Sequence, residues 1–110
     1  MNRPRMTAYA TALLRCLLHR AGEDRNRVFL SHWSTVEWQS LTLEGERHEM
    51  SFVISGDRAL AFAHLWLAGL SDAEFDLPRG FVADIATSGP PRLREDGAVE
   101  VELNALTLDD

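Results

Sequence analysis

The residues best suited to chemistry in this chain are its four histidines and its single cysteine. Histidine titrates near neutral pH and serves as a general acid, a general base or a metal ligand. His32 begins a short run with Trp33, and His48 lies on the next predicted strand. His64 lies in an apolar segment, and the favoured interpretation is that it faces solvent or a backbone carbonyl; the alternative is a buried position, which would disfavour its protonated form. The candidate binding residues are therefore His32, Trp33, His48 and His64.

The spacing of these residues does not form a known catalytic motif. His32 and Ser34 are offset on one extended segment, which does not place a hydroxyl beside a base as a nucleophile pair requires. The sequence contains no G-x-S-x-G, H-E-x-x-H, P-loop or G-x-G-x-x-G pattern. We therefore assign no catalytic residue and expect no cofactor. An active site built from residues distant in the sequence stays open.

Cys16 and His19 are three residues apart on a predicted helix, a spacing that can place two ligands on one metal ion. Two ligands do not make a site, and a small buried side chain is the commoner role of such a cysteine. The histidines lack the further cysteines of a zinc module, so we expect no metal site. One thiol cannot form an internal disulfide and gives no sign of an oxidising compartment.

Formal charge is distributed unevenly along the chain. Residues 1–22 contain four arginines, among them Arg3, Arg5 and Arg15, and no acidic residue. The remaining residues contain seven arginines and seventeen acids, so these two parts carry +4 and −10 within a net charge of −6. The acidic balance and the dispersed arginines disfavour nucleic-acid binding. The favoured interpretation of these arginines is ordinary solvated surface charge. The alternative is contact of the basic first segment with an acidic partner, which a second copy of this chain would supply.

Length and composition indicate a single globular domain over residues 1–110. Of its 110 residues, 45% are hydrophobic and 25% are charged, which is enough for one apolar core without disulfides or a structural metal. No apolar stretch reaches the roughly 20 residues of a membrane span. The first segment has no A-x-A cleavage pattern of a secretory signal. We therefore expect a cytoplasmic protein that does not enter a membrane.

Two segments have the periodicity of helices. Residues 6–21 carry an apolar face and end before Gly22, a typical C-terminal stop. Residues 57–70 are apolar on most sides, with Asp57 or Ser55 as the expected N-cap. A helix this apolar is covered on most of its surface, and a second subunit could provide part of that cover. The candidate interface residues are Ala61, Leu65 and Ala68 on this helix and Arg15 on the first.

The segment between the helices predicts a hairpin. Glu44–Arg47 is typical of a two-residue turn with Gly45 at positive φ. This turn would pair Leu43 with His48 on the apolar side, where His48 would need a hydrogen-bond partner. The apolar phase of the first strand changes near Gln39–Ser40, so we predict a β-bulge there.

The last third of the chain predicts a second hairpin. Residues 81–86 alternate as a strand, and Asp96–Gly97 is typical of a type I′ turn that leads into a strand over 98–108. A change of apolar phase near Asn104–Ala105 predicts another bulge. Residues 36–44 match residues 101–109 at five of nine positions, which either makes these strands neighbours, in the order 2-1-4-3, or reflects chance.

These elements predict an α+β domain in the order α-β-β-α-β-β, with a four-stranded antiparallel sheet and two helices packed on one face. Trp38 is expected in the core, and the outer face of the sheet is expected to carry Glu37, Asp84, Glu100 and Glu102. The favoured function is a small non-enzymatic protein-interaction module that forms a homodimer. The alternative is a small-molecule-binding protein or enzyme with a pocket between the helices and the sheet.

Overall fold

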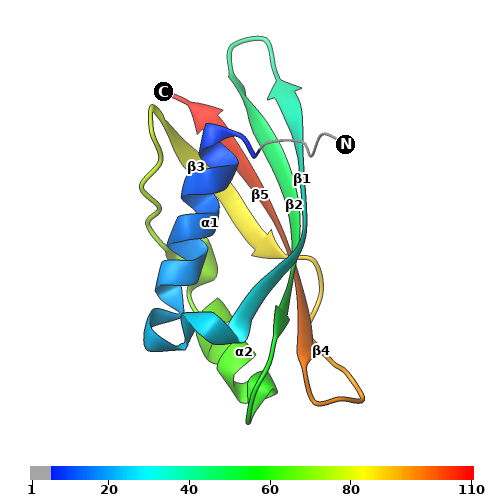
Figure 1. The fold of residues 1–110 in the computed structure, drawn as a ribbon. Helices are drawn as coiled ribbons and strands as arrows, with labels where there is room; N and C mark the ends of the chain where they lie inside the picture. The colour runs from blue at the N-terminus through cyan, green and yellow to red at the C-terminus, as the bar shows by residue number, and fades with distance from the viewer. Residues whose placement is uncertain (1–5) are drawn as a thin grey trace, which may run out of the picture.

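The computed structural model describes residues 6–110 and shows the predicted α+β fold (Figure 1). Arg3 and Arg5 lie outside the described residues. The helices and long strands follow the predicted order: α1 (Ala8–Arg20), β1 (Val28–Gln39), β2 (Glu44–Ile54), α2 (Ala59–Leu67), β3 (Gly80–Thr87) and β5 (Val99–Asp109). The short elements are the 3₁₀ turns η1 (Gly22–Arg27) and η2 (Leu70–Asp72) and the strand β4 (Arg92–Leu93).

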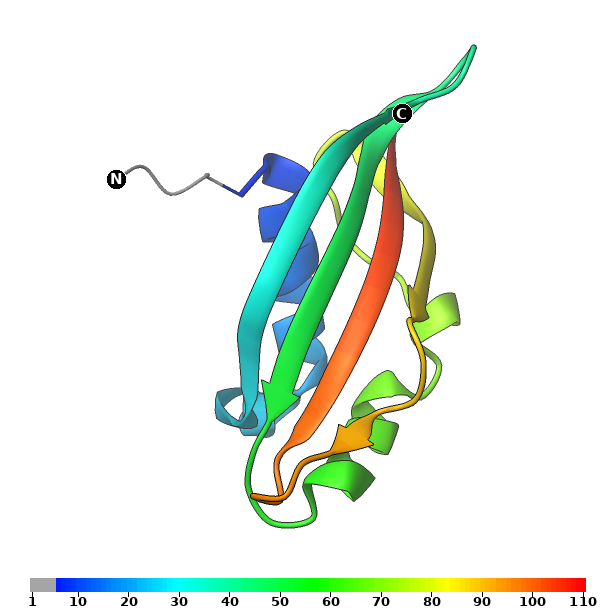
Figure 2. The same cartoon turned by 90° about the vertical axis from the view of Figure 1, so that its right-hand side faces the viewer.

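The strands form one antiparallel sheet in the order β1-β2-β5-β3, with β4 also paired to β5. Both helices cover the same face of this sheet, as predicted, and leave the other face open (Figure 2). The core between the two layers includes Leu13 and Leu17 of α1, Phe52 of β2 and Trp66 of α2. The rings of Phe52 and Trp66 meet edge to face at 5.2 Å, and Trp66 Nε1 donates a buried hydrogen bond of 2.9 Å to the carbonyl of Leu17.

The predicted end of α1 before Gly22 is confirmed, and the helix begins at Ala8, two residues after its predicted start. The side-chain oxygen of Thr7 accepts a hydrogen bond of 3.1 Å from the N–H of Ala10, as an N-cap does. Gly22 follows the helix with a φ of 61°, a conformation that glycine adopts without steric cost. The buried side of α1 is the predicted apolar face.

α2 is shorter than the predicted span of 57–70, and its N-cap prediction was wrong. The helix is preceded by Arg58 in the left-handed conformation, with a φ of 55°, and no side chain caps it. Neither Asp57 nor Ser55 fills the expected role. The packing of the apolar face against the core therefore outweighs the missing cap.

A side chain of α1 caps the C-terminal end of α2. The guanidinium of Arg20 donates hydrogen bonds of 2.8 Å to the carbonyl of Trp66 and 2.9 Å to that of Ala68. These are carbonyls that a helix end leaves without an intrahelical partner. Arg20, one of the basic residues of the first segment, is therefore occupied within the domain.

The first hairpin turns at residues 40–43 and not at Gly45. Ser40 N–H donates to the Leu43 carbonyl at 2.9 Å, and Leu43 N–H donates to the Ser40 hydroxyl oxygen at 3.1 Å. The predicted pairing of Leu43 with His48 is therefore wrong, and His48 lies opposite Thr35. The bulge in β1 also lies elsewhere, at Ser31.

Gly45 is required by a close approach within the sheet. It lies in β2, paired with Trp38 on one side and Leu108 on the other. A Cβ on Gly45 would lie 1.9 Å from the carbonyl oxygen of Thr107, far inside contact distance. The structure does require a glycine at position 45, but the reason is the small space between β2 and β5 rather than a turn with positive φ.

The corrected register also changes which face some side chains occupy. Residues that lie opposite each other share a face, so Val36 and Trp38 point to the open face with Arg47 and Gly45. Glu37 pairs with Glu46 and lies on the helix side, which contradicts its predicted place on the outer face. Trp38 is half-buried on the open face and is not a core residue.

The second hairpin is confirmed in position but not in detail. Gly97 N–H donates to the Arg94 carbonyl, and Gly97 alone in this turn has a positive φ, of 88°, so the turn is not type I′. The bulge lies in β3 at Ala83 and not at Asn104–Ala105. The strand order 2-1-4-3 is also wrong, because β2 rather than β1 lies beside β5.

Candidate functional site

His48 is fully buried at the centre of a polar chain that joins β1, β2 and β5. Its Nδ1 lies 2.9 Å from the hydroxyl of Thr35 on β1, and its Nε2 lies 3.0 Å from the hydroxyl of Thr107 on β5. The ring of Trp33 meets the imidazole edge to face, with centroids 5.8 Å apart. The expectation that His48 is a buried histidine with a hydrogen-bond partner is confirmed.

Counting donors and acceptors places the imidazole proton on Nε2 of His48. Trp33 Nε1 can only donate, and it lies 3.0 Å from the Thr35 hydroxyl and 3.4 Å from Nδ1 of His48, so Nδ1 is an acceptor. The Thr35 hydroxyl then donates to Nδ1, and Nε2–H donates to Thr107. The Thr107 hydroxyl in turn donates a hydrogen bond of 3.3 Å to the backbone carbonyl of Glu46. The neutral imidazole therefore satisfies every member of the chain.

Burial lowers the pKa of His48 from 6.5 to about 4. The carboxylate of Glu46 lies 3.7 Å from Nε2, but the loss of solvent around the ring outweighs its attraction for a proton. The imidazole is therefore neutral at neutral pH, with both nitrogens committed to hydroxyl groups. This arrangement stabilises the sheet and leaves no free nitrogen for a substrate or a metal ion.

Two further hydrogen bonds attach the start of α1 to the sheet. The Thr7 hydroxyl donates to a carboxylate oxygen of Glu46 at 2.7 Å, and the Tyr9 hydroxyl donates to Asp109 at 2.5 Å. Desolvation, followed by the bond to Asp109, raises the pKa of Tyr9 to about 12. These carboxylates position α1 and are not a free catalytic pair.

The structure brings together two of the four candidate binding residues. Trp33 and His48 are in contact, whereas His32 is exposed on the open face of the sheet and His64 is exposed on α2. None of the four lines either of the two grooves along α1 that are described below. The predicted pocket between helices and sheet is occupied by core side chains, so these histidines do not converge on one site.

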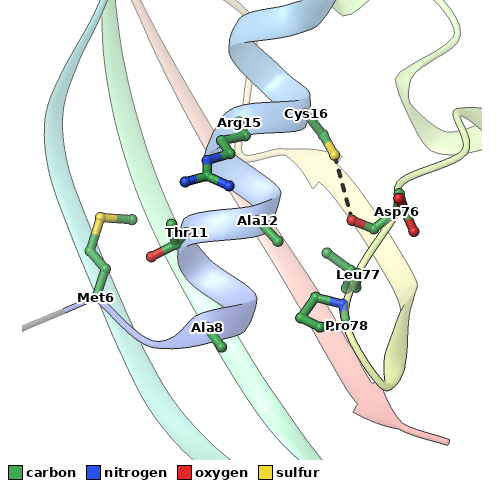
Figure 3. A pocket seen from close by; sticks show the side chains of 9 residues that line it. All are labelled: Met6, Ala8, Thr11, Ala12, Arg15, Cys16, Asp76, Leu77 and Pro78. Carbon is green, nitrogen blue, oxygen red and sulfur yellow. Dashed lines mark hydrogen bonds between the residues drawn. The ribbon is translucent and has the colours of Figure 1, made fainter.

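Two adjoining grooves of about 670 Å³ each run along α1, between this helix and the segment that precedes β3; Figure 3 shows the residues that line the first. Cys16 and Arg15 line both grooves. In Figure 3 the Cys16 sulfur points toward the carbonyl of Asp76, 3.9 Å away, while Arg15 extends in the opposite direction. The second groove adds His19, Arg25 and Phe75 and is also lined by the acids Glu74 and Asp76, so its lining combines apolar side chains with charges of both signs.

The arginines near the helices divide into structural and exposed groups. Arg27 donates to the Ser55 carbonyl at 2.8 Å, and its guanidinium lies 4.6 Å from the ring centroid of Phe62. Arg20 closes α2, as described above. Arg15 is exposed, so within residues 6–110 it is the arginine of α1 that can still meet an acidic partner.

The candidate interface on α2 is exposed but narrow. Leu65 has 76% of its surface exposed, and Ala61 and Ala68 are exposed beside it. The buried side of the same helix contains Ala59, Ala63 and Trp66. One large apolar side chain between two alanines offers little area for a contact.

A larger group of exposed apolar side chains was missed by sequence reasoning. Nine large apolar side chains are exposed in residues 6–110, and five of them lie on β1 or on the turn that follows it: Phe29, Leu30, Val36, Leu41 and Leu43. This hairpin extends beyond the rest of the sheet (Figures 1 and 2). The sequence feature that could have revealed these side chains is the apolar segment with few charges over β1. The incorrect predicted register placed several of these residues in the core instead.

Two classes of site are not found in the part of the chain that the structure describes. It contains no group of three or more histidine, cysteine or acidic side chains placed to hold a metal ion, so Cys16 and His19 have no third ligand. None of its helices has the length and apolar character needed to cross a membrane.

Comparison with known proteins gives a likeness of fold and no match of sequence family. No protein-family model and no curated protein matches this chain. A chain from the virion of a native gene transfer agent (GTA) particle has a similar fold, with a TM-score of 0.50 and 21% sequence identity. The match covers 74% of this chain and 67% of that chain. At this identity the likeness concerns the fold alone.

Proposed function

We propose that this chain is a small non-enzymatic protein-interaction module that acts as a homodimer within a larger protein assembly. The observation that carries the proposal is the concentration of exposed apolar side chains on one projecting hairpin. Exposed apolar side chains that gather on one element are typical of a protein contact. The similar fold of a chain in a virion particle supports a role in an assembly.

The alternative function, a small-molecule site that uses His32, His48 or His64, has less support. Both nitrogens of His48 are bonded within the sheet, and the other two histidines lie on different faces of the domain. The grooves along α1 have room for a ligand but contain no paired acid and base in hydrogen-bond contact. A cytoplasmic location stays a prediction.

The oligomeric state tests the proposed function directly. Light scattering coupled to size-exclusion chromatography, repeated over a wide concentration range, should show a dimer of the full chain. Two surfaces could form the contact, the exposed side of α2 around Leu65 and the hairpin of β1. A monodisperse monomer at every concentration would contradict the homodimer.

A further inference from the structure

The two edges of the sheet differ in their protection against pairing with another strand. β3 has eight residues, carries a bulge at Ala83 with Asp84 beside it, and is followed by Gly89, Pro90 and Pro91. Short length, bulges, charges and prolines are the features by which natural sheets prevent pairing at an edge. The β3 edge is therefore protected.

The β1 edge has few of these features. β1 has twelve residues, with no proline, no arginine and a single acid, Glu37. Its bulge at Ser31 lies near its start, and residues 32–39 pair with β2 in a continuous register. Among the described residues, no strand pairs with its outer side. A long, regular and nearly uncharged edge is a template for one more strand.

Exposed apolar side chains lie at both ends of this edge. Phe29 and Leu30 lie near the start of β1, and Leu41 and Leu43 follow its end. Val36 is the most exposed apolar side chain within β1, at 58%. An antiparallel partner of the same sequence would bring the start of one strand beside the end of the other, so that each apolar end meets an apolar end.

We propose that β1 of a second copy of this chain adds to the β1 edge in antiparallel orientation and joins the two sheets. The inference rests on the homodimer proposed above and names its contact surface. Two copies that meet through the same edge about an axis perpendicular to the sheet have antiparallel strands and all four helices on one face. A copy of β1 fits this edge because it contains no arginine and only one acidic side chain, Glu37.

The faces of the strand restrict the register of this contact. Opposite residues share a face, and between 32 and 39 the even-numbered residues point to the open face. In the register that we infer, Val36 lies opposite Val36 of the second copy. Thr35 then lies opposite Glu37 of the second copy, so no carboxylate meets another carboxylate. The contact covers the most exposed apolar side chain of β1 with its equivalent.

A charge placed at the centre of the contact tests the surface. Val36→Arg brings two guanidinium groups opposite each other, and we expect the dissociation constant of the dimer to rise at least about tenfold. Phe81→Arg is the matched control, because Phe81 is exposed on the opposite edge of the sheet. We expect this control to leave the dimer unchanged in sedimentation velocity. Circular dichroism checks that both variants are folded.

Disulfide trapping tests the register of the contact without adding a charged side chain to it. Cys16 is the only cysteine, so the background variant is Cys16→Ser. Opposite residues of antiparallel strands have Cα atoms about 4.5–5.5 Å apart, within the range that a disulfide spans. We expect Val36→Cys in this background to form a covalent dimer on mild oxidation. Ser34→Cys, on the same face of the same strand, lies too far from its equivalent and should not.

The outcomes separate this inference from the proposed function. A dimer that survives Val36→Arg and dissociates in Leu65→Glu overturns the β1 contact and leaves the homodimer standing on α2. A wild-type chain that stays monomeric overturns both. If Val36→Arg does not fold, the cysteine pair decides: trapping at Val36→Cys alone supports the contact, and any other pattern contradicts it.

Discussion

The two faces of the sheet are made by alternate residues of the same strands, yet they differ in nearly every physical property. The covered face of β2 and β5 contains Phe52 and Val101 and the fully satisfied imidazole of His48. The open face contains Glu102 and the exposed side chain of Val36. A shift of one residue would exchange the two faces, so the covered face determines the register and the open face is free to serve contacts.

The largest effect is expected from a cavity on the covered face. Phe52→Ala removes a ring that is fully buried against Trp66, and we expect a loss of about 3–5 kcal/mol in the free energy of unfolding. Urea denaturation of the wild type and the variant measures this loss. A change below about 1 kcal/mol would show that the core collapses around the site or that Phe52 is less central than its burial indicates.

The buried imidazole should make stability depend on pH. In the folded protein the pKa of His48 is lowered to about 4, so between pH 6.5 and 4 the unfolded chain binds a proton that the folded chain does not. The contribution of the neutral His48 imidazole to the free energy of unfolding is therefore fully present above pH 6.5. It is lost as the pH falls toward 4, by about 3 kcal/mol at most. Chemical denaturation at a series of pH values measures this slope.

Two variants separate the contribution of His48 from that of the carboxylates. His48→Gln removes the titration and should flatten the slope between pH 6.5 and 4, although the variant is less stable at neutral pH. His64→Gln, at an exposed position, is the matched control and should retain the wild-type slope. Equal slopes in all three proteins would contradict the assignment of the pH dependence to His48.

The close approach of β2 and β5 predicts an intermediate effect. Gly45→Ala would place a methyl group against the Thr107 carbonyl, and the two backbones would have to separate. We expect a loss of about 1–3 kcal/mol, typical of overpacking. Gly89→Ala changes another glycine whose added Cβ would meet no atom within 4 Å, although Gly89 has a positive φ of 104°. Thermal unfolding should show the larger loss for Gly45→Ala if interstrand distance, rather than backbone conformation, dominates.

The smallest effect is expected on the open face. His32 is exposed and makes no hydrogen bond through its ring in the described structure, so His32→Ala should change the stability by less than about 0.5 kcal/mol. The midpoint of urea unfolding measures this. A loss above 1 kcal/mol would mean that the open face is less free than its exposure indicates, and it would weaken the contrast between the two faces.

Local patterns were sufficient for the fold class and insufficient for the register. The periodicity of α1 and its Gly22 stop depend on neighbouring residues, and both predictions were confirmed. The turn at 40–43 carries Leu41 and Leu43, whose alternation resembles a strand, and Gly45 resembles a turn residue. The strand order depends on contacts between β2 and β5, residues far apart in the chain, which no local pattern encodes.

In the candidate site, too, the features that depend on one strand were predicted and those that depend on the pairing of strands were not. The burial of His48 followed from its phase with Met50 and Phe52, which any register of β2 preserves. Its partners Thr35 and Thr107 could not be identified, because each lies on a different strand whose register was unknown. For His64 the favoured prediction, a position facing solvent, agrees with the structure, because α2 buries the side that carries Ala63 and Trp66.

The position of β5 affects how the chain can fold during synthesis. β5 occupies the interior of the sheet, between β2 and β3, although it follows both of these strands in the chain. Until residues 99–109 emerge, the hairpin of β1 and β2 has no partner on its inner edge, and β3 has no strand to join. The nascent domain therefore passes through a period in which the covered face of β2 is incomplete and apolar, when binding by a chaperone or a partner chain would compete with folding.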